Sequence, residues 1–208
     1  SNLTSIDVSN FNTSKVTDMN NMFAECSNLI TLDLSNFDTS NVIYMGNPYS
    51  YSYGGMFRNC SSLKELNVSS FDTSKVKQMS NMFDGCSSLT TLDLSNFDTS
   101  NVTAMASMFE KCTSLKNLNL FNFDVSSVTD MSFMFCNCSK LLNLDLSSFK
   151  ESKVTTTRQM FGGCKSLETL NISNFDTSNV TSMVQMFRGC SSLTTLDLSN
   201  FNTSKVTN

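Results

Sequence analysis

Cysteine is the residue type that could supply the most chemistry in this chain, which has eight cysteines and no histidine. Thiols can form disulfides, bind zinc or act as nucleophiles. Seven of the cysteines recur at one position of a repeating unit: Cys26, Cys60, Cys86, Cys112, Cys138, Cys164 and Cys190. The eighth, Cys136, lies two residues before Cys138. Because seven equivalent positions cannot all pair, we expect reduced, buried thiols that pack as small hydrophobic side chains, with disulfides as the alternative.

A column of carboxylates is the second feature that could bind a ligand. One position of the repeat is Asp in five copies and Asn in the other three, and its members include Asp33, Asp93 and Asp145. Oxygen ligands repeated in this way could form a calcium ladder. The alternative, which we favour, is a hydrogen-bonded polar ladder on a solvated surface.

Other catalytic and metal chemistry is disfavoured by what the sequence lacks. The sequence contains neither histidine nor a Cys-x-x-Cys pair, so a zinc site is not expected. No nucleophile has an evident base, and no glycine-rich loop could hold a phosphate. We therefore expect neither an enzymatic activity nor a cofactor.

Charge and hydrophobicity exclude two further classes of partner. The net charge is −4 and the 14 Lys and Arg residues are scattered, whereas nucleic-acid-binding proteins carry basic stripes. No apolar stretch approaches the roughly 20 residues that span a bilayer, so membrane insertion is not expected. Only 39% of the residues are hydrophobic and 15% are charged, and a chain so rich in Ser, Thr and Asn either stays disordered or folds through strict repetition.

Internal repetition sets the elements that must position these residues. Each copy carries Leu-x-x-Leu-x-Leu, then Phe, Val and Met-x-x-Met-Phe-x-x-Cys, with few substitutions. The copies begin 26 residues apart except for one spacing of 34, at Leu3, Leu29, Leu63, Leu89, Leu115, Leu141, Leu167 and Leu193. The chain therefore holds seven complete copies and part of an eighth, which we interpret as one solenoid domain over residues 1–208.

The two halves of each copy have different hydrophobic periods. In Leu92-Asp93-Leu94 the apolar residues alternate with a polar one, which indicates a strand. The Met-x-x-Met-Phe-x-x-Cys run that begins at Met105 places its apolar residues at i, i+3, i+4 and i+7, which indicates one face of a helix. The sequence thus predicts an α/β leucine-rich-repeat solenoid, with one short parallel strand and one short helix or 3₁₀ segment per coil. The Met and Phe residues of the second run are expected in the core.

The complete unit resembles a known family. Its pattern, L-x-x-L-D-L-S-N-F-D-T-S-x-V-T-x-M-x-x-M-F-x-x-C-S-S, is similar to that of the BspA-like leucine-rich-repeat surface proteins. The resemblance extends from Leu3 to the C-terminus, with Thr157 standing where the other complete copies have Met. It implies an extracellular, cell-surface protein, often an adhesin, without catalytic residues. Both ends fall inside the repeat pattern, so we expect a piece of a longer surface protein.

Departures from the repeat are candidate contact residues. The insertion at residues 47–54 holds three of the four tyrosines, and Tyr-rich loops suit binding surfaces, although a tolerated surface loop is the alternative. Phe121 replaces a serine found at its position in the other seven copies. The candidate partner-binding residues are Tyr44, Tyr49, Tyr51, Tyr53, Phe121, Asp33, Asp93 and Asp145.

Three functions are compatible with this pattern. The first is a binding or adhesion module for a protein or glycan on a host or neighbouring cell. The second is a structural spacer or filament element that self-associates end to end. The third and least favoured is ice binding by two rows of threonine: Thr13, Thr39, Thr73, Thr99, Thr177 and Thr203, and Thr17, Thr103, Thr129, Thr155, Thr181 and Thr207.

Overall fold

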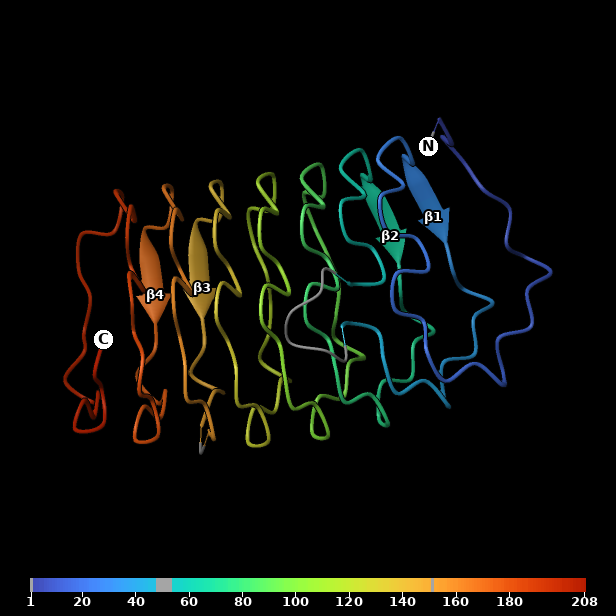
Figure 1. The fold of residues 1–208 in the computed structure, drawn as a ribbon. Helices are drawn as coiled ribbons and strands as arrows, with labels where there is room; N and C mark the ends of the chain where they lie inside the picture. The colour runs from blue at the N-terminus through green and yellow to red at the C-terminus, as the bar shows by residue number, and fades with distance from the viewer. Residues whose placement is uncertain (1, 48–53, 151) are drawn as a thin grey trace.

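The computed structural model describes residues 2–47, 54–150 and 152–208. The chain winds as consecutive coils that lie side by side in sequence order, with the two termini at opposite ends of the stack (Figure 1). The predicted solenoid is therefore confirmed. None of the described residues forms a helix long and apolar enough to cross a membrane.

Short parallel strands form one side of the stack. They are β1 (Thr31–Asp33), β2 (Glu65–Asn67), β3 (Asn143–Asp145) and β4 (Thr169–Asn171). β1 pairs with β2 and β3 pairs with β4, each pair in parallel and one coil apart (Figure 1). In every strand the central Leu is the least exposed of the three residues, so the polar residues on either side of it face outward.

A second parallel ladder lies on another side of the coils. It consists of single bridges that link one residue per coil, namely Asp18, Tyr44, Gln78, Ala104, Asp130, Thr156 and Ser182. Two such ladders hold each coil to the next by backbone hydrogen bonds, which one isolated coil could not make.

The predicted helix or 3₁₀ segment is not seen, because no helix occurs among the described residues. The Met-x-x-Met-Phe-x-x-Cys runs form successive β-turns instead, and their N–H groups alternate between two directions. Within one coil, one set donates to the carbonyl three residues earlier: Met82 to Met79, Asp84 to Asn81 and Cys86 to Phe83. The other set donates to the next coil: Asn81 to Ala106, Phe83 to Met108 and Gly85 to Glu110. Every second N–H is thereby shared between coils, whereas a helix would keep all of them within one coil.

Left-handed backbone conformations make this alternation possible. Asn81 has a φ of 59° and Gly85 a φ of 73°, and the equivalent positions of other coils also have positive φ. A helix cannot continue through such residues. The apolar spacing is nevertheless retained, since both arrangements turn the Met, Phe and Cys side chains inward.

The core is a set of columns that run along the solenoid axis. Phe57, Phe83, Phe109, Phe135 and Phe161 are fully buried. From Phe23 to Phe187, the centroids of neighbouring rings in this column are 5.5–5.9 Å apart and their planes lie within 9° of parallel. Such offset stacking adds to the burial energy of each ring. The Met and Phe residues of these runs are thus in the core of the inner coils, as the sequence predicts, whereas Met22 in the first coil is exposed.

Candidate ligand-binding groove

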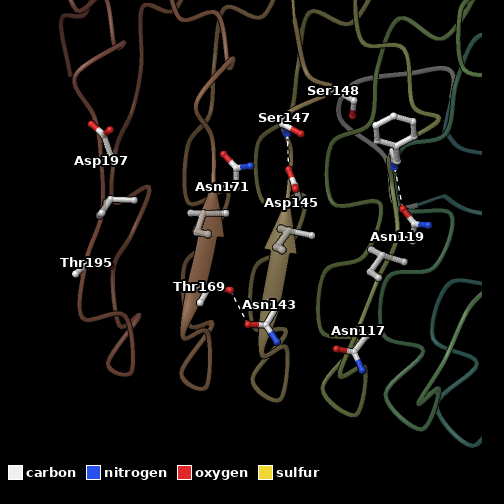
Figure 2. Close-up of a pocket in the computed structure, with 15 residues that line it drawn as sticks. Asn117, Asn119, Asn143, Asp145, Ser147, Ser148, Thr169, Asn171, Thr195 and Asp197 are labelled. Atoms are coloured by element: carbon white, nitrogen blue, oxygen red, sulfur yellow. Dashed lines mark hydrogen bonds between the residues drawn. The ribbon is translucent and has the colours of Figure 1, made fainter.

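A groove of about 990 Å³ lies on the strand side of the last four coils, between Asn117 and Asp197 (Figure 2). We call it the strand-face groove. β3 and β4 form its centre, and the coils on either side complete it. Leucines lie between two polar columns: Asn117, Asn143, Thr169 and Thr195 in the first, and Asn119, Asp145, Asn171 and Asp197 in the second. Leu118 and Leu144 are buried, so the surface offers mainly two rows of hydrogen-bonding groups.

Local hydrogen bonds hold the second polar column in place. The Ser147 N–H donates to Asp145 Oδ1 at 2.8 Å, and the Phe121 N–H donates to Asn119 Oδ1 at 3.1 Å (Figure 2). The same bond, from the N–H two residues later, occurs at this position in all eight coils. The Ser147 N–H lowers the pKa of Asp145, so the carboxylate is ionised at neutral pH. These Asx-type bonds orient the side chains before any ligand arrives.

Phe121 is the prominent exception on this surface. Its side chain is 78% exposed, the most of any large hydrophobic residue among those described. Phe121 lines the strand-face groove and also a neighbouring hollow of about 570 Å³ that includes Ser148 and Lys150. An exposed aromatic ring at the junction of two concavities is the kind of anchor that binding surfaces use.

The predicted contact residues fall into three places. Phe121 and Asp145 lie together in the strand-face groove. Asp33 and Asp93 lie in a separate groove of about 560 Å³ that spans β1 and β2. Tyr44 lines neither groove and belongs to the second ladder, where it bridges Asp18 and Gln78.

The tyrosines of the insertion cannot be placed in the same way. Tyr49, Tyr51 and Tyr53 lie outside the described residues. The residues that flank the insertion are described: Gly46 and Gly55 form an antiparallel bridge, and the Met56 N–H donates to the Met45 carbonyl at 2.9 Å. The two ends of the insertion are therefore held side by side by backbone hydrogen bonds.

The sequence did not single out the first polar column. Asn117, Asn143 and Thr169 line the groove beside Asp145, and the Thr169 hydroxyl donates to Asn143 Oδ1. Each of these residues lies two positions before a member of the Asp or Asn column. Side chains at i and i+2 of a strand share a face, so this spacing could have identified them. Among the described residues no group of three or more His, Cys, Asp or Glu side chains converges on a point that could hold a metal ion.

The cysteines form a hydrogen-bonded column rather than a reactive site. All eight are free thiols. The thiols of Cys60, Cys86, Cys112, Cys138, Cys164 and Cys190 each donate to the carbonyl of a Phe in the preceding coil, at 3.0–3.2 Å. Burial raises the pKa of the Cys112 thiol well above its usual value, which suppresses the reactive thiolate.

One of the two threonine rows points inward. Thr13, Thr39, Thr73, Thr99 and Thr177 are buried. The Thr99 hydroxyl donates to the Asp124 carbonyl at 2.8 Å and accepts the Asp124 N–H at 2.8 Å, so it joins one coil to the next. The other row is mostly exposed, and from Thr103 to Thr207 its hydroxyls donate to carbonyls of the preceding coil. The first row cannot contact an ice surface, and the ice-binding interpretation is wrong for it.

A buried carboxylate lies on the turn side of the stack, away from the groove. Asp84 is 5% exposed, and burial raises its pKa to about 6. Its Oδ1 has no hydrogen-bond partner among the described residues, and the nearest cation is Lys111 Nζ at 3.7 Å. Lys111 Nζ lies closer to Glu110 Oε1, at 2.8 Å. The charge on Asp84 is therefore poorly compensated.

The Asp84→Asn variant is expected to be more stable than the wild type at pH 7, by up to about 3 kcal/mol. The folded pKa of about 6 lies above the ordinary value of 3.8, so the folded state holds this proton more tightly than the unfolded chain. Wild-type stability should therefore rise as the pH falls from 7 to 5, and the variant should lose that rise. Urea unfolding at both pH values measures the effect. The exposed Asp93→Asn variant is the control, and an equal pH response in both variants would contradict the prediction.

Comparison with solved structures identifies the fold. A leucine-rich-repeat protein from T. pallidum matches with a TM-score of 0.54 and 21% identity, over 86% of this chain and 72% of that chain. A leucine-rich-repeat protein from Bacteroides ovatus is 20% identical over 78% of this chain and 44% of its own, with a TM-score of 0.40. The first similarity shows a leucine-rich-repeat fold.

Comparison at the level of sequence identifies the family. No curated protein matches the chain. A family model described as "Mycoplasma protein of unknown function, DUF285" matches residues 1–54, 51–169 and 142–208. Because these overlapping matches run from one end of the sequence to the other, the chain belongs to the DUF285 family.

Proposed function

We propose that this protein is a binding module that receives an extended macromolecular partner in the strand-face groove. The observation that carries the proposal is Phe121, which is 78% exposed at the edge of a groove of about 990 Å³. Exposing an aromatic ring to water is unfavourable, whereas covering it with a partner recovers that free energy. The leucine-rich-repeat fold supports the proposal, because solenoids present extended surfaces to their partners.

The proposed setting is the outside of a cell. The 26-residue unit resembles that of BspA-like surface proteins, which supports an extracellular location and a role in adhesion. The groove fits this role, since hydrogen bonds within each coil orient its polar side chains.

Binding of the fluorescently labelled chain to intact cultured epithelial cells, measured by flow cytometry, tests the proposal. Phe121→Ser installs the residue of the other seven copies and should weaken binding about tenfold or more, since truncation of an aromatic anchor typically costs about 2 kcal/mol. Its melting temperature should match that of the wild type, because the ring makes little contact within the fold.

The matched control is Ile30→Thr. Ile30 is also apolar and 44% exposed, but it lies outside the strand-face groove, and Thr90 occupies the equivalent position two coils later. This variant should bind as the wild type does. If the wild type shows no saturable binding, adhesion to these cells is wrong. If both variants bind equally well, the groove is not the binding site.

A further inference from the structure

The Asp and Asn column alternates strictly along the solenoid. From the second coil to the eighth its members are Asp33, Asn67, Asp93, Asn119, Asp145, Asn171 and Asp197. Adjacent parallel strands lie about 4.8 Å apart, so like side chains recur about every 9.6 Å. The alternation separates the carboxylates and reduces their repulsion. It also gives the surface a chemical repeat of two coils, although its structural repeat is one coil.

Each member of the column has one polar atom engaged and a second one remaining. The Oδ1 atoms of Asn119, Asp145, Asn171 and Asp197 all accept an N–H from their own coil. The second atom is a donor in Asn, the Nδ2 amide, and an acceptor in Asp, the Oδ2 oxygen. Donors and acceptors therefore alternate along one wall of the groove.

The charge of the groove restricts the partner. Its lining contains two carboxylates, Asp145 and Asp197, and no Lys or Arg. A polyanion such as a nucleic acid or a sulfated polysaccharide would be repelled, because nothing in the lining compensates its charge. The remaining polar lining is neutral: Asn, Thr and Ser side chains that both donate and accept hydrogen bonds. This chemistry suits a neutral ligand that is rich in hydroxyl groups.

The spacing distinguishes a glycan from a peptide. In an extended peptide the side chains on one face recur about every 6.8 Å, which matches neither one coil nor two. In an extended β-linked glycan each sugar is rotated by half a turn from the last, so identical hydroxyls recur on every second sugar. That disaccharide repeat corresponds in length to two coils. The nonpolar face of a pyranose ring also stacks on an aromatic ring, which Phe121 provides at one end of the groove.

We propose that the strand-face groove binds a neutral β-linked glycan that lies along the solenoid axis, with one sugar per coil and one end stacked on Phe121. This inference rests on the proposed function and specifies its ligand class. Asn119, Asp145, Asn171 and Asp197 each contact one sugar of the chain, and Asn117 and Asn143 contact hydroxyls on its other side.

Isothermal titration calorimetry with cellotetraose and chitotetraose, whose four sugars match the four coils of the groove, tests the inference. Maltotetraose is the control, because its α-linkages curve the chain out of register with the coils. We expect saturable binding of at least one β-linked tetrasaccharide, at least tenfold tighter than that of maltotetraose. Equal binding of the α- and β-linked sugars, or no binding of either β-linked sugar, would overturn the inference.

Two variants connect binding to the alternating column. Asn119→Asp combined with Asn171→Asp replaces both donors by acceptors and should weaken β-glycan binding at least tenfold, as should Phe121→Ser. Asn67→Asp makes the same change outside the strand-face groove and should have no effect. Equal melting temperatures show that the variants are folded. If Asn119→Asp with Asn171→Asp binds the sugar as the wild type does, the alternation is not what the ligand contacts.

The cell-binding assay separates this inference from the proposed function. Cells treated with periodate, which cleaves vicinal diols of sugars, should lose Phe121-dependent binding, whereas protease-treated cells should retain part of it. If binding survives periodate, is abolished by protease and is not inhibited by either β-linked tetrasaccharide, the glycan inference is wrong and the binding-module proposal stands. If β-linked sugars bind in the groove but cells are not bound, the glycan inference stands and adhesion to these cells is wrong.

Discussion

Replacement of Phe109 by alanine is expected to lower the free energy of unfolding by about 3–5 kcal/mol. Phe109 is fully buried, and its ring stacks on Phe83 and Phe135 with centroid distances of 5.7 Å on both sides. Truncation removes both ring contacts and leaves a cavity in the middle of the column. The column cannot close around it, because the backbone hydrogen bonds of the adjacent coils fix their separation. Urea unfolding followed by circular dichroism measures the loss.

Phe187→Ala provides the comparison for this prediction. Phe187 is the last ring of the same column, is only partly buried and stacks on Phe161 alone. Its truncation leaves an open surface rather than an enclosed cavity, so the loss should be less than half as large. If both variants are destabilised equally, enclosure within the column does not determine the effect.

Replacement of Gly55 by alanine is expected to destabilise the fold by about 3 kcal/mol, at the upper end of typical overpacking. A Cβ at Gly55 would lie 2.1 Å from the Asn81 carbonyl oxygen and 2.4 Å from its carbonyl carbon. Both atoms belong to the backbone of the next coil, so no side chain can move aside. The two coils would have to separate next to Gly55. Thermal unfolding monitored by circular dichroism gives the size of the effect.

The contrasting variant is Gly162→Ala. A Cβ there would lie 3.3 Å from the Gln159 Cβ and carbonyl oxygen, and Gly162 does not have a positive φ. Small adjustments can accommodate the methyl group, so a change within about 1 kcal/mol is expected. A Gly55→Ala protein as stable as Gly162→Ala would show that the close approach of these two coils is not required.

The sequence predicted the stacking of the coils and the inward positions, but not the conformation of the second half of each coil. The spacing from Met105 to Cys112 fits a helix, yet successive β-turns turn the same side chains inward. Glycine in three copies, at Gly85, Gly163 and Gly189, is the feature that favours turns, because glycine weakens a helix and adopts positive φ readily.

Bonds between coils were also beyond what one repeat unit could reveal. Thr99 and Cys112 each look like an ordinary small residue within their own unit. Their partners, Asp124 and Phe83, lie 25 and 29 residues away in sequence. Only the register between coils brings these groups together, and that register depends on the turn geometry that the sequence did not specify.

The candidate site was predicted only in part, because it also depends on the register between coils. Phe121 departs from the repeat and Asp145 belongs to its polar column. The structure places both residues in one groove. Asp33 and Asp93 were predicted from the same column, but they line a different groove. The lining of each groove depends on the relative position of several coils. The spacing of residues along the sequence does not define that position, so it could not show that the two grooves are separate.

The missing hydroxyl at Val125 has a mechanical consequence. The Thr99 hydroxyl donates to the Asp124 carbonyl and accepts the Asp124 N–H, which joins two coils. Val125 occupies the same position one coil later and has no hydroxyl to form these bonds. The Lys150 N–H donates to the Ser148 carbonyl of its own coil instead. A pull applied to both ends of the solenoid loads its coil-to-coil junctions in series. We therefore expect tension to rupture this junction first, and the junction separates the coil of Phe121, at one end of the strand-face groove, from the three coils that form the rest of the groove. If the strand-face groove binds a ligand as proposed, a pull on the solenoid would separate Phe121 from the rest of the groove before the remaining coils unravel.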